Sequence, residues 1–175
     1  MKNIMKIKTI FYFFMFVCSI SATAQNLNFE IDLFPSLSYG SDFDAGYNGT
    51  GFSIEYQHPL TEKWNALGGI EYGFVGWGNQ GLVELGVARK LVEKEKMSLQ
   101  GEFILLNGLA WFRPKSLYVW GGEVNVVSVF PIRKKSSISL SLGLRYSQCP
   151  AYKDYGMINS YLDIPVKIGW RIGNI

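Results

Sequence analysis

The sequence has few of the residues from which catalytic and metal sites are usually built. It contains one histidine, His58, and two cysteines, Cys18 and Cys149, among 175 residues. Such a set excludes a zinc site made from a cluster of Cys and His, and no carboxylates occur at the spacing of a calcium-binding loop. We therefore expect neither a metal nor another cofactor.

The sequence also lacks an apolar run long enough for a transmembrane helix. The most apolar run, residues 10–20, is shorter than the roughly 20 residues that cross a bilayer as a helix. It follows a segment with three lysines and precedes the small residues 22–24, which is the pattern of a cleaved secretory signal peptide. We predict a signal peptide at residues 1–24 and one domain at residues 25–175.

A net charge of one sign is absent from the predicted mature chain. The full sequence has 17 Lys and Arg against 14 Asp and Glu, but three of the lysines lie in residues 1–24, which leaves 14 of each sign. A basic surface for nucleic acid is therefore not indicated, and we expect no nucleic-acid partner. Cys149 is then the single cysteine of the exported chain, so an internal disulfide is excluded.

The chain has instead a regular alternation of polar and apolar residues. Near its end, one face of an extended segment is polar and carries Asp163, Lys167 and Arg171, because strand side chains alternate with a period of two. The other face is apolar and is predicted to contact lipid; it consists of Leu162, Ile164, Val166, Ile168, Trp170 and Ile172. Pro165 lacks a donor for strand pairing, so we expect it near the outer rim.

Eight such two-faced segments follow one another along the chain. They lie near residues 27–39, 52–57, 64–75, 83–90, 97–105, 118–130, 137–147 and 161–172. Short polar turns alternate with generally longer connections, and an even number of antiparallel strands closes a barrel without a free edge. The pattern predicts an all-β, eight-stranded antiparallel up-and-down transmembrane β-barrel, with lipid outside and a polar interior.

Every predicted strand places at least one charged residue on its polar face. An eight-stranded barrel is just wide enough for side chains to fill it, so we predict an ion-pair network that plugs the interior. The predicted members are Glu30, Asp32, Glu55, Glu71, Glu84, Lys90, Glu102, Glu123, Arg145, Asp163, Lys167 and Arg171.

The signal ending S-A-T-A-Q, the two-faced strands and the closing Y-L-D-I-P-V-K-I-G-W-R-I resemble the outer membrane protein β-barrel domain family of Bacteroidota, which is related in form to OmpX-like small barrels. The resemblance covers residues 25–175, and its most specific part is Ile164-Pro165. It implies a place in the cell outer membrane and contact with the outer-membrane insertion machinery. Such barrels often end on an aromatic residue that this machinery recognises, whereas this chain continues past Trp170 to residues 173–175.

The favoured function is that of a non-enzymatic outer-membrane barrel, serving envelope structure or surface interaction and adhesion. Its partners would be outer-membrane lipid and a surface partner bound by the outer loops. Tyr47, Tyr152 and Tyr155 are the contact candidates, because tyrosine makes rigid amphipathic contacts.

Two other function classes remain open. In a soluble lipocalin-like barrel the apolar faces would point inward around a ligand, and alternation alone does not say which face is outward. In a lipid-A-modifying membrane enzyme His58 would act as the general base. That site needs a partnered nucleophile and acid, and the nearby Ser53 and Glu55 have the opposite strand phase.

Overall fold

The computed structural model describes residues 26–34, 49–75, 78–112, 115–155 and 159–173. The predicted signal peptide and Tyr47 lie outside the described residues. The elements are β1 (Asn26–Phe34), β2 (Gly49–Pro59), β3 (Trp64–Val75), β4 (Gly78–Lys94), β5 (Met97–Phe112), β6 (Lys115–Arg133), β7 (Ser136–Gln148), the 3-10 helix η1 (Pro150–Tyr155), β8 (Ser160–Asp163) and β9 (Val166–Gly173).

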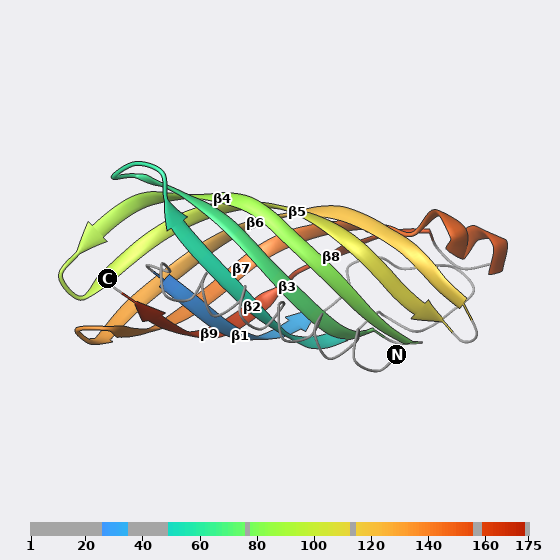
Figure 1. The fold of residues 1–175 in the computed structure, drawn as a ribbon, viewed down its shortest axis with the longest axis horizontal. Helices are drawn as coiled ribbons and strands as arrows, with labels where there is room; N and C mark the ends of the chain where they lie inside the picture. Colours follow the sequence, from blue (N-terminus) through green and yellow to red (C-terminus); the bar gives the residue numbers. More distant parts are fainter. Residues whose placement is uncertain (1–25, 35–48, 76–77, 113–114, 156–158, 174–175) are drawn as a thin grey trace, which may run out of the picture.

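The strands form a closed barrel. Each of β1 to β7 pairs antiparallel with the next strand in the chain, and β9 pairs with both β7 and β1. β8 and β9 are two parts of one strand, because Asp163 faces Arg145 and Val166 faces Leu142 in a single register on β7. The structure confirms the predicted eight-stranded antiparallel up-and-down barrel (Figure 1).

The last strand is interrupted at Pro165, and the expected position of this residue at the rim is wrong. The strand begins five residues earlier, at Ser160, and β8 pairs with β7 before the break. The carbonyl of Pro165 still accepts a hydrogen bond from the backbone N–H of Gly143, with an N to O distance of 3.0 Å. The proline therefore removes one donor from the wall without shifting the register.

The two ends of the barrel differ in their connections. Short turns join β2 to β3, β4 to β5 and β6 to β7 at the end where β9 finishes, which we call the terminal end (Figure 1). η1 lies at the opposite end, which we call the loop end. No helix among the described residues is long and apolar enough to cross a membrane.

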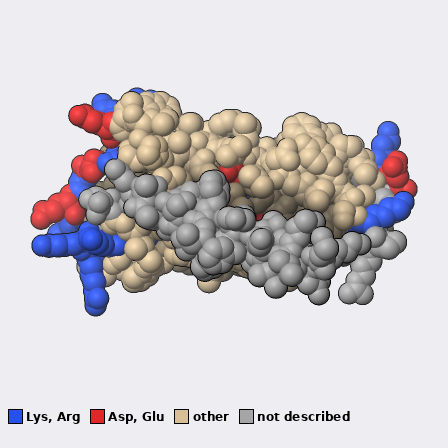
Figure 2. Space-filling view, in the orientation of Figure 1, with Lys and Arg blue, Asp and Glu red and all other residues tan. Residues whose placement is uncertain are grey.

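The polarity of the barrel is inverted relative to a soluble protein. On β1, Ile31 points outward and is 66% exposed, while Asp32 points inward and is 0% exposed. The same alternation repeats around the wall, so large apolar side chains are exposed and charged side chains are buried. Figure 2 shows Lys, Arg, Asp and Glu at both ends of the molecule and a largely uncharged wall between them.

The interior also contains an apolar part. Ile104 and Leu106 on β5 point inward, and they pack with buried apolar residues of the neighbouring strands toward the loop end. This cluster includes Leu82, Ala110, Leu117, Val119, Cys149 and Tyr161. The alternation in the sequence becomes unclear over residues 104–112 because apolar residues occupy both faces of β5 there.

Candidate functional site

Arg145 connects opposite walls of the barrel. Its guanidinium donates two hydrogen bonds to the carboxylate of Glu71, one of them with a distance of 2.8 Å from Nη1 to Oε1. Its Nε donates to Glu123 on the adjacent strand β6. β7 and β3 lie four strands apart in a ring of eight, so Arg145 crosses the whole lumen.

Lys167 on β9 makes a second crossing at the same ion cluster. Its Nζ lies 2.8 Å from Oε1 of Glu123 and 3.7 Å from Oε1 of Glu84 on β4, the strand on the opposite side of the ring. Asn125 donates to Glu123 from Nδ2 at 2.6 Å. Five strands thus converge on one cluster whose charged side chains are buried.

A second tier lies toward the terminal end. Arg171 donates from Nη1 to Gln100 at 3.0 Å, and its Nη2 lies 3.4 Å from Glu102. Gln57 donates to Glu55 at 2.9 Å and also reaches Glu102 at 3.4 Å. This tier links β9, β5 and β2, so ion pairs and amide bridges fill the lumen at two levels.

Glu30 and Asp32 belong to the β1 side of the interior. Glu30 accepts hydrogen bonds from Asn28 at 2.6 Å and from Ser53 at 3.3 Å. Asp32 lies directly across from Lys167 on the paired strand β9, but neither of its carboxylate oxygens has a hydrogen-bond partner among the described residues. Asp163 on β8 is also buried and faces Arg145 across the strand pair.

Carboxylates outnumber basic side chains in this interior. The buried charged residues of the described chain are eight acids, Glu30, Asp32, Glu55, Glu71, Glu84, Glu102, Glu123 and Asp163, and three bases, Arg145, Lys167 and Arg171. Within the same part of the chain, no group of three or more His, Cys, Asp or Glu side chains is arranged to hold a metal ion.

Lys90 does not join the interior network and corrects the sequence-based assignment. It lies at the terminal end with 34% of its side chain exposed, and its Nζ is 3.4 Å from the carboxylate of Glu93. Residues three apart on a regular strand point to opposite faces. A bulge between Lys90 and Val92 inserts one extra residue, which returns Glu93 to the inner face beside Lys90.

The apolar face of the last strand points outward. Leu162, Ile168, Trp170 and Ile172 are exposed, whereas Ile164 and Val166 are half-buried around the break at Pro165. Aromatic residues gather on the outer wall toward the loop end, around Tyr72. Its ring centroid lies 5.7 Å from the ring centroid of Phe52, 5.2 Å from that of Phe74 and 6.1 Å from that of Trp111.

His58 lies on the outer wall near the terminal end. Its Nδ1 is 3.3 Å from the hydroxyl of Tyr56, and the two rings are stacked. Ser53 and Glu55, by contrast, are buried in the lumen. The structure therefore separates the histidine from the nucleophile and the acid that a hydrolytic site would require.

The outer-loop candidates are placed only in part. Tyr152 and Tyr155 belong to η1, which lies at the loop end (Figure 1), while Tyr47 lies outside the described residues.

Uncharged polar residues of the interior were missed by the sequence analysis. Asn28, Gln57, Gln100 and Asn125 are buried and join the carboxylates to one another or to a basic group. Their inward strand phase follows from the sequence, but the predicted interior network was restricted to charged residues and so did not include them.

Comparison with known proteins gives a fold and no sequence family. No protein-family model matches the chain, and no curated protein matches it. Among solved structures, the crystal structure of Ail, the attachment invasion locus protein of Yersinia pestis, superposes with a TM-score of 0.50 at 15% identity, covering 84% of this chain and 95% of that one. The chain is similar in fold to Ail.

Two further structures of Ail superpose at 15% identity. The outer membrane protein Ail in a phospholipid bilayer nanodisc gives a TM-score of 0.42, covering 85% of this chain and 99% of that one. Ail in complex with the heparin analogue sucrose octasulfate gives 0.46, with coverage of 84% and 95%. At this identity the likeness shows the fold alone, which is that of an eight-stranded antiparallel β-barrel.

Proposed function

We propose that the protein is a non-enzymatic integral outer-membrane β-barrel with a plugged interior, exported by a signal peptide that is cleaved after residue 24. The loop end faces the outside of the cell and serves surface contact or adhesion, while the terminal end faces the periplasm. We also propose that the chain belongs with the Bacteroidota-type, OmpX-like small barrels that it resembles in sequence.

The inverted polarity of the wall is the observation that carries this proposal. Exposed leucine, isoleucine, valine and aromatic side chains cover the outside of the barrel, while its buried charged groups lie in the lumen and other charged groups lie at the two ends. In water such a surface would expose far more continuous apolar area than a soluble monomer tolerates. In a bilayer the same wall is solvated by lipid, and the closed sheet satisfies its backbone hydrogen bonds.

The soluble lipocalin-like alternative requires the reverse arrangement. A barrel of that class holds a ligand among inward apolar side chains, whereas here the middle of the lumen contains Arg145, Lys167 and their carboxylate partners. The lipid-A-modifying alternative has no support from His58, whose ring contacts Tyr56 on the outer wall.

The difference between the connections at the two ends of the barrel supports a surface role. The turns at the terminal end are short, whereas η1 adds structure beyond the wall at the loop end (Figure 1). The structural neighbour Ail is named for attachment and invasion. We propose that Tyr47, Tyr152 and Tyr155 contribute to the contact surface of this chain, and that the insertion machinery receives the barrel through its last strand.

Cysteine labelling tests the proposed orientation. Lys153→Cys lies in η1 and Lys134→Cys in the turn between β6 and β7, and both positions are exposed. The native Cys149 is buried, so its background reaction is low. A membrane-impermeant maleimide applied to intact cells should label the Lys153 variant and spare the Lys134 variant until the cells are broken. Labelling of the Lys134 variant alone in intact cells would contradict the proposed orientation and indicate the opposite one.

A further inference from the structure

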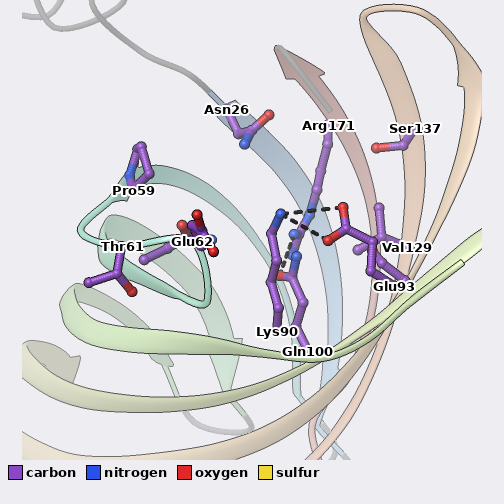
Figure 3. Close-up of a pocket in the computed structure, with 12 residues that line it drawn as sticks. Asn26, Pro59, Thr61, Glu62, Lys90, Glu93, Gln100, Val129, Ser137 and Arg171 are labelled. Atoms are coloured by element: carbon purple, nitrogen blue, oxygen red, sulfur yellow. Dashed lines mark hydrogen bonds and ion pairs between the residues drawn. The ribbon is translucent and has the colours of Figure 1, made fainter.

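The lumen opens at the terminal end into a polar cavity of about 210 Å³ (Figure 3). Gln100 lines the cavity and accepts a hydrogen bond from Arg171, which also approaches the buried Glu102. The inner boundary of the cavity is therefore the terminal tier of the interior network. The outer boundary includes Glu62 on the exposed turn between β2 and β3.

Two buried donor atoms on the wall of this cavity have no acceptor in the part of the chain that the structure describes. Arg171 on β9 and Ser137 on β7 lie directly opposite each other in the strand pair, and both line the cavity. Arg171 is 4% exposed and Ser137 is 1% exposed. Neither Nε of Arg171 nor Oγ of Ser137 has a hydrogen-bond partner among the described residues. Because buried donors are usually satisfied, this pair is suited to an acceptor that enters from outside.

Both basic groups at the cavity already have a carboxylate partner. Nη2 of Arg171 lies 3.4 Å from Glu102. Lys90 and Glu93 pair with each other at 3.4 Å. Glu62 makes no hydrogen bond or ion pair within the described part of the chain. The groups left for a ligand are therefore the donors Nε of Arg171 and Oγ of Ser137 and the carboxylate of Glu62, which together suit a ligand with one anionic and one cationic group.

The size of the cavity admits a small organic ligand. Its volume of about 210 Å³ is well above the space that one water molecule needs, so a small free amino acid can enter. We propose that the cavity binds a small free amino acid as its zwitterion, with the carboxylate accepting from Arg171 and Ser137 and the ammonium group held by Glu62. A carboxylate is the acceptor that an arginine side chain binds most strongly among protein-like groups.

This inference adds a ligand to the proposed barrel and does not depend on what the loop end contacts. The cavity is formed by side chains of the terminal end alone, so its binding can be measured on purified, folded protein in detergent micelles. Failure to bind would leave membrane insertion unaffected, and failure to insert would be detected separately by fractionation.

The test measures the binding of three related probes by isothermal titration calorimetry. Alanine carries both charges, N-acetylalanine carries only the carboxylate, and alanine amide carries only the ammonium group. We expect saturable binding of alanine, weaker binding of N-acetylalanine and no binding of alanine amide. Ser137→Ala should weaken alanine binding by about tenfold, because it removes a hydrogen bond to a charged group.

Two further variants make the result specific. Glu62→Gln should weaken binding of alanine but leave binding of N-acetylalanine unchanged, because only alanine has an ammonium group. Ser141→Ala is the matched control, since Ser141 is also a buried inward serine of β7 with an unpartnered hydroxyl but does not line the cavity. Each variant is first shown to migrate as a folded barrel on unheated gels. Absence of saturable alanine binding, or equal effects of Ser137→Ala and Ser141→Ala, would overturn the proposal.

Discussion

Arg145 on β7 and Glu71 on β3 hold opposite walls of the barrel together through a two-pronged contact inside the lumen. Both side chains are buried, and Glu123 completes the coordination of the guanidinium. A buried ion pair of this kind is weak evidence for net stability, but removing one member leaves the other charge uncompensated. The lumen is therefore closed by groups that depend on each other.

Replacing Arg145 by leucine should destabilise the barrel strongly. The change leaves Glu71 and Glu123 buried without their shared cation, and breaking a buried pair in this way costs about 3–5 kcal/mol. The measurement is urea unfolding of the protein in micelles, in which the folded fraction is monitored by the gel shift between heated and unheated samples.

The partner residue provides the control for this prediction. Glu71→Gln combined with Arg145→Leu should cost less than the sum of the two single changes, because residues in one network are coupled. Lys134→Leu, on an exposed turn, should have little effect. Additive effects of the two interior changes would show that the contact across the lumen does not stabilise the barrel.

Two adjacent glycines should respond differently to alanine. A Cβ atom at Gly69 would lie 2.6 Å from Oε2 of Glu84 and 2.9 Å from the backbone oxygen of Ile54, whereas a Cβ atom at Gly68 would meet nothing within 4 Å. We expect Gly69→Ala to lower the urea midpoint, because it crowds the inner face of β3, and Gly68→Ala to leave it unchanged or raise it. Equal midpoints for the two variants would show that the inner face has room to spare.

A charge on the outer wall should be costly at mid-height and tolerated at the rim. Leu85 on β4 is 61% exposed and Leu60 in the turn after β2 is 59% exposed, so in water both would accept arginine. In a bilayer, Leu85→Arg should cost about 2–4 kcal/mol and Leu60→Arg at most about 1 kcal/mol. Equilibrium folding into phospholipid vesicles measures this difference, and equal costs would count against a lipid-facing wall.

The filled lumen should not conduct small solutes. Two tiers of ion pairs and an apolar cluster occupy it, and eight strands enclose little space beyond their own side chains. Liposomes containing the purified protein should therefore show no swelling in isotonic sugar, while liposomes with a porin swell in the same assay. Swelling that grows with the amount of this protein would contradict the plugged interior.

The architecture follows from the sequence because a barrel wall has a strict period of two. Residues such as Ile168 and Lys167 occupy opposite faces wherever the strand is regular, and the pairing of consecutive strands then closes the ring. A choice between lipid outside and ligand inside is not contained in the alternation. It required the observation that the charged faces converge in the lumen.

The details that could not be predicted arise where the period breaks or where partners come from distant strands. The bulge after Lys90 moves Glu93 onto the inner face, and no local signal in E-K-E-K marks it. Pro165 interrupts the strand inside the wall, and the strand keeps its register there because the carbonyl of Pro165 remains paired with Gly143. The pairing of Arg145 with Glu71 depends on the tilt and closure of the whole barrel, which strand phase does not specify.

Fractionation of cells that express the full chain tests the central claim most directly. The inverted barrel should be recovered in the outer-membrane fraction, require detergent for extraction and migrate differently on gels with and without heating. Recovery of folded protein in the soluble periplasmic fraction without detergent would contradict a lipid-facing wall and with it the proposed function.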